Sequence, residues 1–198
     1  FGSIIFSTIS ISPFFYKSFN LKRVYYSGYV PISYDNRLPS IGTAVPLLRE
    51  NRLYQTDWLL RFYGFDVREL LNTEYPNLES DIDPKLSWAL RNLDQFPIDI
   101  NKADMRMLLR VPGLGVKSVH KIIGARRYRK LNWENLKSIG AALNRAKYFI
   151  TCDSRIFEGK DRTAAQLKGL IMNSSESKFR KELSTQLNLF DNQSLLPK

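Results

Sequence analysis

Two amphipathic helices flank a glycine-rich turn near the middle of the chain. In each helix, apolar side chains recur at the i, i+3 and i+4 spacing of a buried face: Met105, Leu108 and Leu109, then Val119, Ile122 and Ile123. The first helix is predicted to start at Lys102, with Asn101 as its N-cap, and to end near Arg110 because Pro112 removes a backbone donor. The second is predicted over residues 116–127.

The turn between these helices has the sequence Pro-Gly-Leu-Gly. Gly113 and Gly115 permit positive φ angles, and they leave backbone N–H groups uncovered by any side chain. The turn precedes the second helix, where the helix dipole adds partial positive charge. The pattern therefore predicts a cradle of backbone amides for a phosphate group.

Helical spacing continues on the N-terminal side of the turn. A broad apolar face covers residues 46–63, with Pro46 near its start, and Gly64 is placed to end the helix. Asp66 with Glu69 is typical of a capping box that opens a short helix, and residues 83–84, Asp-Pro, open another.

A second hairpin is predicted on the C-terminal side. Asn132 is a suitable cap for a helix over residues 133–138, and Gly140 then leads into a helix over 141–147. This segment, LKSIGAALNRA, resembles a degenerate copy of the first hairpin because it carries one glycine where the first carries two. A short strand is predicted over 148–152.

The ends of the chain differ from this helical middle. Residues 4–11 alternate loosely, and residues 21–29 are rich in β-branched and aromatic side chains, so both are predicted to be strands. Residues 34–46 carry the turn formers of a linker. A last helix is expected over 161–172, and Ser, Glu, Lys, Asn and Gln dominate from Asn173 onward.

The predicted fold is thus mainly α, a helical domain with two consecutive hairpins, the second degenerate, preceded by a small α/β segment. The boundaries follow from these patterns: an α/β segment and linker over 1–45, a helical domain over 46–152 with the first hairpin at 101–127, a C-terminal helix region over 153–172, and a flexible tail over 173–198.

Charge is concentrated around the first hairpin. The chain has 30 Lys and Arg against 19 Asp and Glu, a net charge of +11. Between positions 102 and 130 nine basic residues accompany one acidic residue, so this segment alone carries +8. The nine are Lys102, Arg106, Arg110, Lys117, Lys121, Arg126, Arg127, Arg129 and Lys130. Such density favours a polyanion partner over the alternative, a corner of an all-α core with a solvated basic rim.

Composition excludes several other classes. A single cysteine, Cys152, excludes a disulfide framework within the chain and a four-cysteine zinc or iron–sulfur site, and the single histidine, His120, makes no metal site. No run of eighteen apolar residues is present, so we expect no membrane span and a cytoplasmic protein. The chain begins with Phe1, so we expect a lost initiator or a piece of a longer protein.

The segment VPGLGVKSVHKII closely resembles the helix-hairpin-helix motif. That motif binds the DNA backbone without reading sequence, through hairpin amides and a following lysine, and paired hairpins form a compact five-helix unit. The resemblance implies DNA contacts, mainly with the duplex backbone, at Val111, Gly113, Leu114, Gly115, Val116, Lys117, Ser118, Lys121, Arg126 and Arg127.

Residues 21–152 also resemble the C-terminal half of a bacterial family of putative DNA modification or repair radical SAM proteins. The sequence segments on which this resemblance rests are LKRVYYSGYVPI, PLLRENRLYQTDWLLRFYGFDVREL, LDQFPIDINKAD, the hairpin, and LNRAKYFITC. The family's catalytic half is a partial barrel in which a Cys-x-x-x-Cys-x-x-Cys motif binds a [4Fe–4S] cluster that cleaves S-adenosylmethionine. Those cysteines are absent here, so no cofactor is expected in this chain, and residues 21–29 would be the last barrel strand.

The tail carries a third resemblance. Gln186, Leu187, Leu189 and Phe190 match the Gln-Leu-x-Leu-Phe pentapeptide by which bacterial replication and repair proteins dock on the sliding clamp. A tether with a few apolar anchors can hold an enzyme on DNA without ordering a large surface. Folding of the tail onto its own helices, or chance, is the alternative.

Two other functions remain open from the sequence. In endonuclease III-like glycosylase/lyases a lysine after the hairpin attacks the sugar, and Lys117 takes that place, but Asn135, beside Glu134, stands where those enzymes place an Asp. The chain could instead be a structural or RNA-binding module. Four aromatic residues near the basic segment could then stack on unpaired bases, although aromatic residues at helical spacing more often belong to the core: Tyr128, Trp133, Tyr148 and Phe149.

Overall fold

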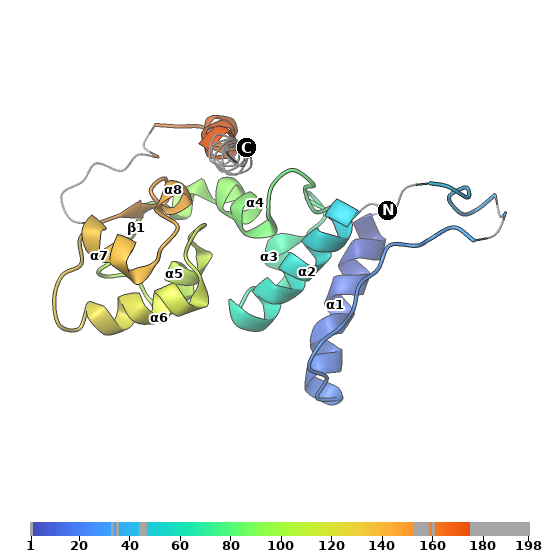
Figure 1. The fold of residues 1–198 in the computed structure, drawn as a ribbon, viewed down its shortest axis with the longest axis horizontal. Helices are drawn as coiled ribbons and strands as arrows, with labels where there is room; N and C mark the ends of the chain where they lie inside the picture. The colour runs from blue at the N-terminus through green and yellow to red at the C-terminus, as the bar shows by residue number, and fades with distance from the viewer. Residues whose placement is uncertain are drawn as a thin grey trace, which may run out of the picture.

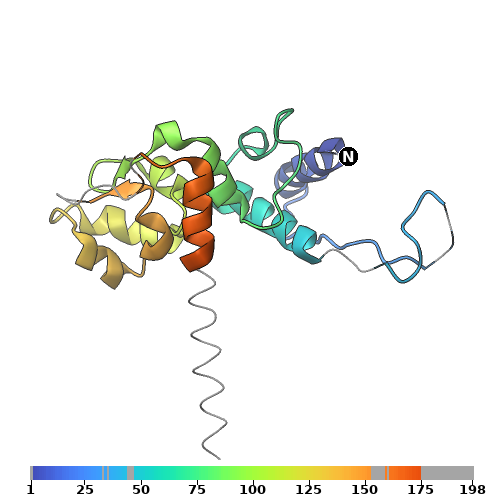
Figure 2. The same cartoon turned by 90° about the horizontal axis from the view of Figure 1, so that it is seen from above.

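A computed structural model describes residues 2–32, 34, 36–43, 47–152, 159 and 161–174. The described chain is mainly helical, as the sequence predicts, with one two-stranded sheet (Figures 1 and 2). Its elements are α1 (Gly2–Ser18), α2 (Leu47–Phe62), α3 (Val67–Leu70), α4 (Pro84–Arg91), the 3₁₀ turn Leu93–Gln95, β1 (Ile98–Asp99), α5 (Met105–Arg110), α6 (Val116–Ala125), α7 (Trp133–Ile139), α8 (Leu143–Ala146) and β2 (Ile150–Thr151). Residues 164–174 form a last helix.

The tandem hairpins form one module closed by the small sheet. α5 and α6 make the first hairpin, α7 and α8 the second, and the parallel pair of β1 and β2 joins the start of the module to its end (Figure 1). Ile98 pairs with Ile150, and the Ile100 N–H donates to the Thr151 carbonyl at 3.1 Å. The sheet therefore belongs to the hairpin module and not to the N-terminal segment.

The main core lies between α4 and this module. α4 is buried along most of its length, with Pro84 to Leu90 all shielded from solvent, because the hairpins cover one side and residues 164–174 lie against another (Figure 2). Leu108, Leu114 and Val119 fill the space beneath the first hairpin. Apolar burial at about 25 cal/mol per Å2 makes this core the main source of stability.

The two predicted N-terminal strands are wrong. Residues 4–11 lie inside α1, where Ile5, Ile9 and Ser12 follow helical spacing and are buried against α2 and α3. Residues 21–29 form no strand because the backbone of Tyr26 pairs with a side chain: its N–H donates to Tyr54 Oη at 3.0 Å, and its carbonyl accepts from the same hydroxyl at 2.9 Å. No described helix is both long and apolar enough to cross a membrane.

The predicted start of the hairpin helix is also wrong. α5 begins three residues later, with Asp104 as its N-cap, whose carboxylate accepts from the Met107 N–H at 2.7 Å. Asn101 instead bonds Leu131, accepting from its N–H at 2.8 Å and donating to its carbonyl at 3.1 Å. α6 ends at Ala125, two residues short of the prediction.

The other predicted caps are confirmed. Asp66 and Glu69 form a capping box at α3, and Asp83 caps α4. Asn132 caps α7, and Gly140 ends it with φ +86°. Each of these signals acts within four residues of the helix end, where sequence patterns are most direct. Pro46, residues 153–158 and residues 175–198 lie outside the described part of the chain.

Candidate nucleic-acid interface

The first hairpin is a tight turn anchored by one buried side chain. After Arg110 the chain turns through Val111 and Gly113, which has φ +89°, and the Leu114 N–H donates to the Val111 carbonyl at 3.2 Å. Leu114 is only 1% exposed, so its side chain holds the turn onto the core. Gly115 then becomes the N-cap of α6. The turn is thus fixed to the core at its apex, Leu114, and is open to solvent along its rim, which is formed by the backbone of Gly113 and residues 115–118.

Backbone N–H groups without an acceptor gather at this rim. Within the described part of the chain, five residues have backbone N–H groups without an acceptor: Gly113, Gly115, Val116, Lys117 and Ser118. The Val119 N–H is the next donor along α6 and bonds the Gly115 carbonyl at 2.9 Å. Gly115 also supplies no side-chain cap. Free donors at the positive end of a helix dipole form a site for an anion such as phosphate.

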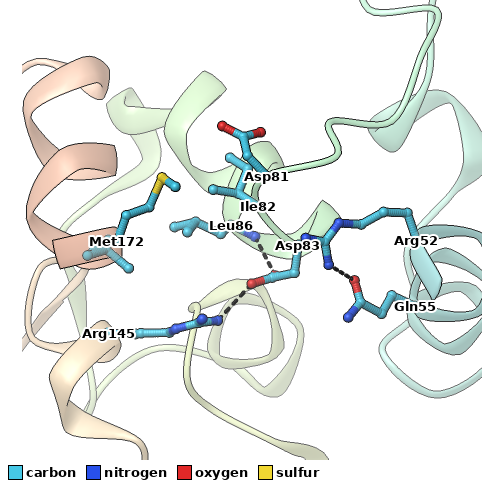
Figure 3. A pocket seen from close by; sticks show the side chains of 9 residues that line it. Arg52, Gln55, Asp81, Ile82, Asp83, Leu86, Arg145 and Met172 are labelled. Atoms are coloured by element: carbon cyan, nitrogen blue, oxygen red, sulfur yellow. Dashed lines mark hydrogen bonds and ion pairs between the residues drawn. The ribbon is translucent and has the colours of Figure 1, made fainter. Parts of the chain in front are cut away.

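The second hairpin supports the first one. The Ala142 N–H, at the position equivalent to Gly115, donates to the Gly113 carbonyl at 3.1 Å and is therefore not available to a ligand. Arg145 of α8 points at Asp83, with 2.7 Å between its Nη1 and the carboxylate oxygen, at the edge of a 310 Å3 pocket (Figure 3). The second hairpin, which carries one glycine where the first carries two, thus uses this amide to hold the first hairpin in place and does not offer it to a ligand.

Gly113 is required by both conformation and space, and we expect Gly113→Ala to destabilise the fold by about 2–3 kcal/mol. A Cβ there would lie 2.6 Å from the Ala142 carbonyl oxygen and adopt φ +89°. Gly140→Ala is the matched control, since it has φ +86° but nothing within 4 Å, and it should cost about 1 kcal/mol. Urea denaturation of both variants measures the difference. Equal losses would show that the hairpins do not meet at Gly113.

A stripe of exposed basic side chains runs away from the amides along α6. Lys117, His120 and Lys121 follow the i, i+3, i+4 spacing and are exposed, and Arg127 and Arg129 continue the charge beyond the helix end. None of the five has an ion pair among the described residues. The free backbone amides and the ammonium groups of Lys117 and Lys121 thus face solvent on the same helix.

Several basic residues counted with this cluster have other partners. Arg110 is 2% exposed and bonds Glu69 at 2.6 Å. Arg126, predicted to contact DNA, is partly buried and donates to the carbonyls of Ile100 (3.1 Å) and Ala103 (2.5 Å). Arg106 pairs with Glu69 at 3.2 Å. The structure therefore gives Arg110 and Arg126 roles in holding the module together, whereas Arg106 remains 71% exposed.

The other residues predicted to bind nucleic acid or the sliding clamp lie in different environments. The side chains of Val111 and Leu114 are buried and cannot reach a ligand, while Val116 and Ser118 are partly exposed at the rim. Tyr148 and Phe149 belong to the core, so their proposed stacking on RNA bases is wrong, whereas Tyr128 is 91% exposed. The clamp-binding residues Gln186, Leu187, Leu189 and Phe190 lie outside the described part of the chain.

The glycosylase interpretation gains no support from the geometry. Asn135 belongs to the capping box of α7, accepting from the Asn132 N–H at 3.2 Å. Among the described residues, no hydrogen bond or ion pair joins Lys117 to a carboxylate. A lysine nucleophile needs a nearby group to handle protons, so Lys117 suits phosphate contact better.

The residues present do not fit an iron–sulfur cluster. Cys152 is the one cysteine of the sequence, it is buried, and its Sγ donates to the Leu131 carbonyl at 3.1 Å. Among the described residues no group of three or more His, Cys, Asp or Glu could hold a metal ion. A cluster of the radical SAM type would need its cysteine ligands from elsewhere.

One residue beneath the hairpin, Lys85, was not singled out from the sequence. Lys85 of α4 is 8% exposed, and its Nζ donates to the Leu114 carbonyl at 2.6 Å. Its ammonium also lies 4.6 Å from the ring centre of Tyr63. Burial lowers the pKa of Lys85 to about 7, an effect that the charge of Asp83 opposes and that of Arg110 reinforces. The sequence feature that could have indicated a buried lysine is its position as the one charged residue in the stretch from Pro84 to Leu90.

Comparisons with known proteins show a similarity to a curated protein over part of the chain. No family model matches the chain. No solved structure matches it either. The chain is similar to the Holliday junction branch migration complex subunit RuvA of Idiomarina loihiensis, with 25% identity over an alignment that covers 58% of this chain and 57% of that protein. The chain thus spans less than two thirds of the relative's length.

Proposed function

We propose that this chain binds the DNA backbone without reading base sequence, and that its first hairpin makes the contact. The observation that carries the proposal is the group of acceptor-free N–H donors from Gly113 to Ser118, at the N-terminus of α6 and beside Lys117 and Lys121. Backbone donors and flexible cations suit phosphate oxygens and carry no base information. The similarity to a protein named for the Holliday junction supports DNA as the polyanion.

We further infer that this DNA binding serves a DNA modification or repair enzyme of radical SAM type in the bacterial cytoplasm. The support is the resemblance of residues 21–152 to the C-terminal half of that family. The catalytic half would supply the cluster and S-adenosylmethionine, and this chain would supply the grip on DNA. Residues 186–190 would tether the complex to the sliding clamp.

The salt dependence of duplex binding tests the role of Lys117. The chain is titrated against a duplex of about 20 base pairs and the matching single strand, with fluorescence anisotropy as the readout over a range of salt concentrations. Loss of one phosphate contact in Lys117→Ala should reduce the slope of log K against log salt by about 0.9. Lys22→Ala removes the same charge from the exposed surface of the N-terminal segment and should leave the slope unchanged.

Two outcomes would contradict this proposal. A slope that falls equally in the Lys117 and Lys22 variants would mean that binding responds to net charge and not to the hairpin. A preference for single-stranded RNA that is lost in Tyr128→Ala would favour the RNA-binding alternative, because Tyr128 is 91% exposed between Arg127 and Arg129 and can stack on an unpaired base.

A further inference from the structure

Lys85 lies directly behind the proposed phosphate site. Asp83 and Pro84 start α4 so that Lys85 falls in its first turn, facing the hairpin. Its Nζ donates to the Leu114 carbonyl at 2.6 Å, and it is 8% exposed. The Asp83 carboxylate is engaged with the Leu86 N–H at 2.9 Å and with Arg145 at 2.7 Å. The ammonium is therefore aimed at the hairpin apex.

The contact with Leu114 bears on the direction of the amide that follows it. The carbonyl of Leu114 and the N–H of Gly115 belong to one trans peptide group, so they point in opposite directions. Because Lys85 holds the carbonyl toward the core, the Gly115 N–H faces the rim where the other free donors lie. A positive charge on the carbonyl side also polarises the peptide and strengthens its N–H as a donor.

We propose that Lys85 is a positioning residue for the phosphate site: its ammonium fixes the Leu114–Gly115 peptide so that the Gly115 N–H binds a DNA phosphate more tightly. The inference rests on the proposed function, because it assigns a support to the same amides. Lys85 touches no phosphate in this scheme. It acts through one peptide group.

The charge on Lys85 depends on pH near neutrality. Its pKa is lowered from its ordinary value of 10.5 to about 7, mainly by burial. The charged and titratable groups that face it are Asp83 at the start of α4, Arg110 of α5 and Tyr63 after α2. Below about pH 7 the ammonium supports the amide, and above it the support weakens. Duplex affinity should therefore fall as the pH rises through this range.

The stability of the fold should change in the opposite direction. In the unfolded chain Lys85 stays protonated up to its ordinary pKa of 10.5, whereas in the folded chain it loses its proton above about pH 7. The unfolded state then binds more protons, so the contribution of Lys85 to stability rises with pH between these two values. Weaker binding at higher pH thus cannot be attributed to unfolding through this group.

The experiment compares duplex affinity at about pH 6 and about pH 8.5. His120 is replaced by Gln in every protein, so that its imidazole contributes nothing. The parent should lose about fivefold in affinity at the higher pH. Lys85→Met should bind weakly at both values with an unchanged salt slope, because it removes no phosphate contact. Lys121→Met is the matched control and should reduce the slope but keep the pH dependence.

A readout without DNA separates this inference from the proposed function. The amide resonance of Gly115 in the free protein should titrate near pH 7 in the parent and remain constant in Lys85→Met, with Lys85→Gln as the second variant if Met does not fold. If the duplex binds with the expected salt slope but Lys85→Met keeps the parent's affinity and pH dependence, only the role of Lys85 is overturned. If the duplex does not bind at all, the proposed function fails, and this inference with it.

Discussion

We expect Gly115→Asp to weaken duplex binding by about ten- to a hundredfold while the fold remains as stable as before. Gly115 has φ −87° and ψ 163°, which any residue adopts, and an added Cβ would meet only the Tyr63 hydroxyl at 3.8 Å. The new carboxylate would accept the free N–H groups of α6 and repel phosphate from them. The variant therefore blocks the site with no backbone strain.

Stability and binding should thus respond differently to this change. Asp is a better N-cap than Gly by a few tenths of a kcal/mol, so thermal denaturation should show an unchanged or slightly raised midpoint. Gly115→Asn is the matched variant, because it caps the same amides without charge. Its binding should fall between those of the parent and the Asp variant, which separates coverage of the donors from electrostatic repulsion.

Ala142→Asp tests whether the second hairpin binds DNA in the same way. Ala142 is the N-cap of α8 and is exposed, but its N–H already donates to Gly113. The same negative charge should therefore cost less affinity here than at Gly115. Equal losses at both positions would contradict the assignment of the phosphate site to the first hairpin, and wild-type affinity in Gly115→Asp would contradict the amide site itself.

The features that the sequence predicts well are those decided by near neighbours. The Pro-Gly-Leu-Gly turn, the capping box at Asp66, the N-cap at Asn132 and the helix-ending glycine Gly64 each depend on a few consecutive residues. The mainly α architecture follows from the same local signals. The N-terminal strands failed because Ile5 and Ile9 satisfy both a loose alternation and the i, i+4 spacing of a helix, and packing against α2 and α3 selects the helix.

The features that the sequence misses are those decided across the fold. Lys85 bonds a carbonyl 29 residues away, and Arg110 pairs with Glu69 at a separation of 41 residues. The local sequence does not distinguish a buried basic side chain from an exposed one. The net charge of the segment around the hairpin therefore overstates the number of basic side chains that DNA can contact. β1 was missed for the same reason, since its two residues are a strand only because β2 lies beside them.

Arg110 and Arg106 show the difference between a buried and an exposed basic side chain most clearly. Both pair with Glu69, at 2.6 Å and 3.2 Å, but their side chains are 2% and 71% exposed. Arg110 also donates to the carbonyls of Tyr63 and Gly64, each at 3.0 Å, and its guanidinium stacks 3.7 Å from the centre of the Phe65 ring. The buried arginine thus joins the end of α2 to α3 and α5.

We expect Arg110→Met to lower the free energy of unfolding by about 2–4 kcal/mol, because it removes three hydrogen bonds from a buried guanidinium to the Tyr63 and Gly64 carbonyls and the Glu69 carboxylate. Arg106→Met should cost less than about 1 kcal/mol, since an exposed ion pair contributes little. Urea denaturation of the two variants measures both values. Similar losses would mean that Arg110 is not the link between the N-terminal helices and the hairpin module. A large loss confined to Arg110 would explain why a residue within the basic cluster serves the fold and not the DNA.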